Sequence, residues 1–180
     1  MTIPNLISVF RLLLVPVIVW LIIEHNMFWA FWLFVIAGAS DAVDGIIARQ
    51  LGGASELGAY LDPLADKTLM VSIYVCLAFV DELPAWLVIT VVSRDILIIG
   101  AVMLSWTMGR PVTIRPLFVS KANTAAQIVL ASMVLGATAF AVPLDAAKTL
   151  MIVLTALLTV VSTAAYLVEW LRHMTGEARS

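Results

Sequence analysis

Four aspartates stand close together in an otherwise apolar part of the chain: Asp41, Asp44, Asp62 and Asp66. On an α-helix the first two project about 60° apart and the last two about 40° apart, so each pair points in one direction. The two pairs lie on consecutive helices with a short connection, so they can face each other across a helix interface. A charge at membrane depth costs at least about 2.5–3.5 kcal/mol, and four carboxylates in one partly dry pocket repel one another. A divalent cation would remove that repulsion. Oxygen ligands without a nearby His or Cys favour Mg²⁺ or Mn²⁺ over zinc.

Four acids exceed what one Mg²⁺ usually takes from protein, which leaves room for two metal ions. Because Mg²⁺ tends to share its coordination sphere with substrate phosphates, the pattern indicates phosphoryl transfer on a membrane-associated substrate. Two other interpretations stay open. The acids could be interface residues or partners of Arg49 and Lys67, or they could form the site of a divalent-cation transporter. Against the transporter, the acids lie toward one membrane face and no two halves of the chain repeat.

The elements that hold these acids are predicted to be membrane helices. Of the 180 residues, 63% are hydrophobic and 12% charged, whereas a soluble domain is about 45–50% apolar and about 25% charged. This composition excludes a soluble globular fold, a disordered chain and a disulfide scaffold. The net charge of −2 gives no indication of nucleic-acid binding, which is typical of basic proteins. At about 20 residues per span, six transmembrane helices are predicted: Leu6–Ile23, Met27–Arg49, Leu61–Val80, Pro84–Trp106, Ala122–Val142 and Ala146–Leu171.

Lys and Arg are distributed unevenly among the breaks between these spans. The chain ends and the second and fourth breaks carry or adjoin most of the bases, whereas the odd breaks carry acids and only Lys148. The positive-inside rule then predicts both termini in the cytoplasm. Met1–Asn5 lacks the basic region of a signal peptide, so the first span is expected to be a mature helix. We expect an all-α integral membrane protein with a single membrane-embedded catalytic domain over residues 1–180.

The aspartates belong to a longer pattern, D-x2-D-G-x2-A-R-x8-G-x3-D-x3-D, which also fixes Gly45, Ala48, Arg49 and Gly58. This pattern resembles the signature of the CDP-alcohol phosphotransferase family. The resemblance implies a six-helix membrane fold, usually a homodimer, with a cavity open to the cytoplasmic leaflet. It also implies catalysis with bound Mg²⁺ or Mn²⁺.

The resemblance assigns a role to each signature position. Asp66 would be both a metal ligand and the general base that takes a proton from the acceptor hydroxyl. Arg49 would meet phosphate or help order the carboxylates. The other metal ligands would be Asp41, Asp44 and Asp62. The small residues that give the cytidine diphosphate room would be Gly45, Ala48 and Gly58.

Two further stretches, Thr2–Arg11 and Arg115–Gln127, resemble the cardiolipin synthase branch of the family, and Val92–Asp95 fits that branch. The opening stretch is also similar to phosphatidylglycerophosphate synthases, so it does not separate the two branches. The branch implies phosphatidyl transfer from CDP-diacylglycerol to phosphatidylglycerol, giving cardiolipin and CMP. The branch occurs in mitochondria and some bacteria, and we expect a bacterial cytoplasmic (inner) membrane with the active site facing the cytoplasm. The alternative is a phosphatidylglycerophosphate synthase, which uses glycerol 3-phosphate. Those enzymes more often carry a second base near Lys121, where this chain has Ala122 and Asn123.

Either acceptor is anionic and would need bases at the cytoplasmic mouth of the site. Four bases are candidates for acceptor or phosphate binding: Arg94, Arg110, Arg115 and Lys121. Positive-inside topology explains the last three equally well. For Arg94 the alternative is an ion pair inside the membrane, although its neighbour Asp95 is expected to point elsewhere on the helix.

Other polar residues are expected to be structural. Arg11 and Asn5 are predicted to anchor the first span at the membrane interface, with phosphate contact as the alternative. Asn123 and Gln127 lie one helical turn apart and either hydrogen-bond between helices or line the pocket.

Overall fold

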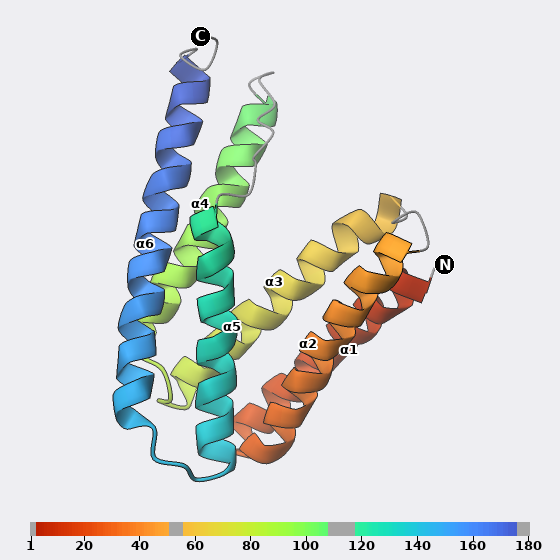
Figure 1. Ribbon diagram of the computed structural model, residues 1–180, viewed down its shortest axis with the longest axis vertical. Helices are drawn as coiled ribbons and strands as arrows, with labels where there is room; N and C mark the ends of the chain where they lie inside the picture. The colour runs from red at the N-terminus through yellow and green to blue at the C-terminus, as the bar shows by residue number, and fades with distance from the viewer. Residues whose placement is uncertain (1–2, 51–55, 108–117, 176–180) are drawn as a thin grey trace. The chain divides into compact units, whose positions relative to one another are not determined.

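A computed structural model describes the backbone of residues 3–50, 56–107 and 118–175, and the side chains of residues 7–41, 64–105, 107 and 118–172. Within these ranges every regular element is a helix (Figure 1). Each helix covers one of the six predicted apolar stretches, with ends that differ by a few residues. The helices are α1 (Ile3–Ile23), α2 (Met27–Gln50), α3 (Glu56–Phe79), α4 (Ala85–Thr107), α5 (Phe118–Ala139) and α6 (Asp145–Thr175).

Within the described residues, three of these helices are long and apolar enough to cross a membrane, judged by length and composition. They are Ala85–Ser105 in α4, Phe118–Ala139 in α5 and Asp145–Arg172 in α6. Shorter apolar stretches occupy Ile7–Ile23 in α1 and Met27–Asp41 in α2. The regular elements in the described part of the chain are therefore all helices, as predicted, and three of them have the length and composition of a membrane span.

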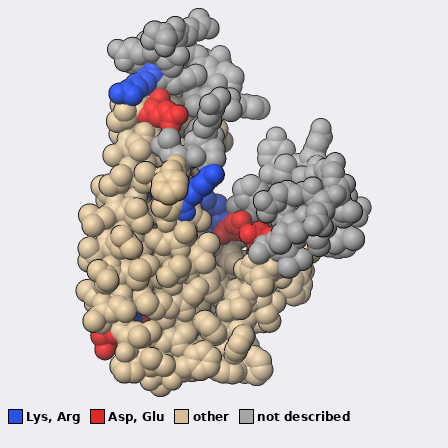
Figure 2. Space-filling view, in the orientation of Figure 1, with Lys and Arg blue, Asp and Glu red and all other residues tan. Residues whose placement is uncertain are grey.

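Large apolar side chains lie exposed on each helix, while several polar ones are buried. Phe79 is 75% exposed and Leu150 is 68% exposed, whereas Arg11 and Asn123 are fully buried. Figure 2 shows only a few charged side chains on the described part of one face. An apolar exterior around polar interior groups is the distribution expected of a protein surrounded by lipid.

Helices α1, α3 and α5 end in the same way, with a non-glycine residue at positive φ. These residues are His25 (56°), Asp81 (60°) and Ala141 (52°). In α1 the Asn26 amide then donates to the Leu21 carbonyl over 2.8 Å, and equivalent bonds close the other two helices. This is the Schellman motif, which satisfies carbonyls at a helix end. Each of these helices therefore stops at a defined residue and reaches the next helix through a short turn.

The chain divides into two compact units. The first comprises Met1–Pro84 and Ala131–Leu144. In it, α1 packs against both α2 and α3, and aromatic rings of α2 pack edge-on against Phe140, with Phe31 at 5.5 Å between centroids. Gly136 permits this approach, because a Cβ there would lie 3.1 Å from the Phe31 ring.

The second unit comprises Ala85–Leu130 and Asp145–Ser180. Helices α4 and α6 pack together in it, and the Trp170 indole donates a 2.8 Å hydrogen bond to the hydroxyl of Ser105. The expectation of one domain over residues 1–180 stays a prediction.

Candidate active site

Arg11 joins two of the signature aspartates. Its guanidinium is 1% exposed, and Nη2 lies 2.8 Å from Oδ1 of Asp41 on α2. Nη1 donates a hydrogen bond to Oδ1 of Asp66 on α3. Each of the two carboxylate side chains is 48% exposed. One buried cation from α1 therefore holds two acids from different helices, and each acid keeps a face open to its surroundings.

The position of α1 explains why an arginine is needed there. In the described part of the chain α1 packs against α2 and against α3, whereas no close backbone approach joins α2 to α3. We expected the aspartate pairs to face each other across a shared helix interface. Asp41 and Asp66 instead meet on a long side chain from the helix that packs against both.

The expectation that Arg11 is an interfacial anchor is wrong. Its side chain is buried and paired with two acids. An unpaired charge at such a site would carry a penalty of several kcal/mol, and two carboxylates offset that cost. The available signal was a charge inside an apolar segment, which marks a functional site by default.

The other signature positions lie on the same two helices. The backbones of Asp44, Gly45, Ala48 and Arg49 belong to α2, and those of Gly58 and Asp62 belong to α3. Their side chains, and all of Arg110 and Arg115, lie outside the described residues. Among the residues whose side chains are described, no group of three or more His, Cys, Asp or Glu side chains gathers in one place.

Arg94 lies at the centre of a buried polar network in the second unit. Nη1 donates to Asp95 over 2.7 Å, and Nη2 donates to Ser120 on α5 and Ser162 on α6, over 2.5 and 2.9 Å. The guanidinium also lies 5.6 Å from the centre of the Tyr166 ring. The expectation that Asp95 points away is wrong, because the arginine side chain is long enough to reach its neighbour.

The remaining predicted polar residues also take defined places. The Thr159 hydroxyl on α6 donates toward Oδ1 of Asn123 on α5 over 2.8 Å, so Asn123 links two helices. Gln127 is buried one turn further along α5. Lys121 is exposed near the start of that helix.

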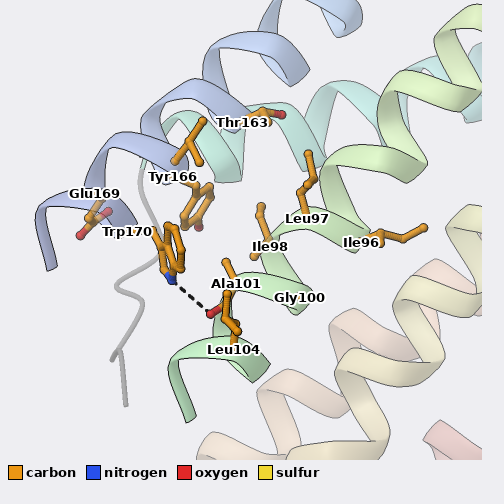
Figure 3. A pocket seen from close by; sticks show the side chains of 11 residues that line it. Ile96, Leu97, Ile98, Gly100, Ala101, Leu104, Thr163, Tyr166, Glu169 and Trp170 are labelled. Carbon is orange, nitrogen blue, oxygen red and sulfur yellow. Dashed lines mark hydrogen bonds between the residues drawn. The ribbon is translucent and has the colours of Figure 1, made fainter. Parts of the chain in front are cut away.

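A hollow of about 440 Å³ opens between α4 and α6 (Figure 3). Its wall is mostly apolar, and the Trp170 indole that borders it also donates to the carbonyl of Ala101 over 3.2 Å. All of its lining residues belong to the second unit. They are Ile96, Leu97, Ile98, Gly100, Ala101, Leu104, Thr163, Tyr166, Leu167, Glu169 and Trp170.

The geometry places two signature acids on one internal cation. The family described as CDP-alcohol phosphatidyltransferase matches residues 1–171. The chain belongs to the CDP-alcohol phosphatidyltransferase family. The match covers the signature on α2 and α3 as well as Arg11 on α1.

Individual relatives of the chain carry two kinds of name. The human cardiolipin synthase (CMP-forming) is 39% identical over 155 residues, which cover 77% of this chain and 52% of the human protein. A fission yeast (Schizosaccharomyces pombe) cardiolipin synthase (CMP-forming) / mitochondrial hydrolase fusion protein is 35% identical, covering 93% of this chain and 31% of that protein. The chloroplastic CDP-diacylglycerol–glycerol-3-phosphate 3-phosphatidyltransferase 1 of rice is 36% identical, over 75% of this chain and 46% of the rice protein. The chain spans about half the length of the curated relatives it matches.

Proposed function

We propose that this protein transfers the phosphatidyl group of CDP-diacylglycerol to phosphatidylglycerol and so makes cardiolipin and CMP. The observation that carries the proposal is the pairing of Asp41 and Asp66 on Arg11, because it brings signature acids of α2 and α3 to one site. The likeness to cardiolipin synthases supports the choice of acceptor.

The donor set fits a divalent cation. Asp41 and Asp66 offer carboxylate oxygens on half-exposed side chains, and oxygen is what Mg²⁺ and Mn²⁺ prefer. Two ions would be held by the four signature aspartates: Asp41, Asp44, Asp62 and Asp66. When bound, they would supply charge neutralisation at the diphosphate and at the leaving CMP.

The chain's own residues would handle the proton and the phosphates. Asp66 would accept the proton of the acceptor hydroxyl. The oxygen of that hydroxyl forms a bond to the phosphatidyl phosphorus, while the bond from that phosphorus to CMP breaks. The half-exposed carboxylate of Asp66 can be reached by a substrate. Arg49 would contact phosphate, and the cytidine diphosphate would lie against Gly45, Ala48 and Gly58.

Acceptor recognition is proposed for four bases. Lys121 is exposed on the first turn of α5 and could meet an anionic headgroup. Arg94 would act through Nε, since both of its terminal nitrogens already donate within the protein. The other two bases are Arg110 and Arg115.

We propose that all six helices span a bacterial cytoplasmic (inner) membrane, with both termini and the active site on the cytoplasmic side. The excess of bases in the even breaks supports this orientation. The exposed apolar side chains on each helix support lipid contact. A homodimer is proposed by analogy with the family.

The deciding experiment offers the purified chain CDP-diacylglycerol with Mn²⁺ or Mg²⁺ and one acceptor at a time. We expect CMP release and cardiolipin with phosphatidylglycerol. The rice relative favours a second candidate, in which glycerol 3-phosphate is the acceptor and phosphatidylglycerophosphate the product. Product analysis separates the two. If folded protein with metal releases CMP with neither acceptor, both assignments are wrong.

A further inference from the structure

Arg11 reaches the two acids through different nitrogens. Nη2 lies beside Asp41 and Nη1 beside Asp66, and in both contacts the acid uses Oδ1. The guanidinium is a rigid planar fork, so the spacing between its terminal nitrogens is fixed. Two carboxylates held on the two prongs are therefore held at a fixed separation from each other.

The burial of Arg11 makes this arrangement stiff. The whole residue is inaccessible, and its neighbour one turn earlier, Ser8, is buried as well. Among the described residues the Nε of Arg11 has no hydrogen-bond partner. The side chain is therefore held chiefly by the two acids and by packing. Leaving the ion pairs would strand a charge in a dry site.

We infer that Arg11 is a positioning residue for the divalent-cation site, setting the distance and orientation of Asp41 and Asp66. This rests on the proposed function, because it assumes that those acids bind metal. The exposed faces of both carboxylates are the ones available to a cation, while Arg11 occupies the buried side. Outer partners of this kind orient metal ligands, and removing one typically lowers metal affinity about 10–100-fold.

Charge repulsion alone predicts the opposite change in metal affinity. Arg11 is a cation beside a cation site, so its removal would strengthen metal binding if simple repulsion decided the outcome. Positioning predicts weaker binding when the fork is lost, even if a positive charge remains. Two variants separate these effects. R11Q removes both the charge and the fork, and R11K keeps the charge on a single nitrogen.

The experiment titrates Mn²⁺ alone into the purified full chain in detergent micelles and measures free Mn²⁺ by electron paramagnetic resonance. Wild type, R11Q and R11K are compared, with K148Q as a matched loss of one base on α6. Size-exclusion profiles and melting temperatures identify folded samples. We expect the dissociation constant for Mn²⁺ to rise about 10-fold or more in both Arg11 variants and to stay unchanged in K148Q.

Unchanged or tighter Mn²⁺ binding in R11Q overturns the inference, and so does wild-type affinity in R11K. If R11Q does not fold, R11K decides alone, because it leaves a cation between the acids. Failure of the proposed metal site has a different signature, since wild type itself would then bind no Mn²⁺. If phosphatidylglycerol is not the acceptor, the expected Mn²⁺ affinities of all four proteins stay the same, because the titration contains no acceptor.

Discussion

Asp66 is held by Arg11 through Oδ1, and an asparagine at this position would keep an oxygen there for the same contact. The substitution D66N therefore removes the negative charge and the basicity while leaving an acceptor for the buried arginine. This separates the chemical role of the carboxylate from its structural one.

We predict that D66N lowers CMP release by about 100-fold or more, the usual contribution of a general base. The assay is CMP release from CDP-diacylglycerol at saturating Mn²⁺, with the melting temperature measured in the same detergent. D145N, a neutralised acid on the first turn of α6, is the matched control and should retain activity. Full activity in D66N would remove Asp66 from the role of base.

At the level of residues, sequence reasoning singled out four acids and missed the arginine that pairs with two of them. Helical spacing predicts that Asp41 and Asp44 share a direction, because the period of a helix is fixed. No spacing rule connects position 11 to positions 41 and 66, which meet only through the packing of α1 between their helices. Asp95 was misjudged for a related reason: backbone direction is periodic, but a long side chain can fold back to its neighbour.

The helices themselves were predictable from the apolar runs between charged breaks. Their C-terminal ends were harder to predict, because the residues with positive φ at the ends of α1, α3 and α5 are His, Asp and Ala. Glycine is the usual sequence signal for such a helix end. Without it, a Schellman motif is visible only in the backbone hydrogen bonds.

Two glycines inside helices make a matched pair for a stability test. A Cβ added at Gly100 of α4 meets nothing within 4 Å, whereas one at Gly136 of α5 lies 3.1 Å from Cε2 of Phe31. Alanine is favoured over glycine in a helix interior by about 1 kcal/mol. At Gly136 the Phe31 ring must shift, which works against that gain.

We predict that G100A raises the free energy of unfolding by about 0.5–1 kcal/mol. G136A should raise the free energy of unfolding by less than G100A does, or lower it. Reversible unfolding in mixed micelles, followed by circular dichroism, measures both. A loss of stability in G100A would contradict open space at this position and would indicate that another body packs there, such as the partner of the proposed homodimer.

For the molecule as a whole, the proposed topology places the turns after α1, α3 and α5 on the face opposite the aspartates. Cys76 is buried and is the only cysteine in the sequence. Replacing it by alanine gives a background in which single cysteines report which side of the membrane they occupy.

In intact cells we predict that a membrane-impermeant maleimide labels cysteines placed at Glu24 and Val142. Cysteines at Thr107 and Arg172 should react only after the membrane is opened. All four native residues are exposed, so accessibility is set by the side of the membrane. Labelling of all four positions in intact cells would rule out the six-span arrangement.

The burial of Arg11 has a consequence for how the protein is made. Arg11 leaves the ribosome 55 residues ahead of Asp66, a delay of about 3 to 11 s at ordinary rates of synthesis. During that interval its charge has no partner on α3, and a lone arginine inside a bilayer is unfavourable. We therefore expect the first helix to wait near the membrane surface and to settle into the bilayer only as the second and third helices arrive.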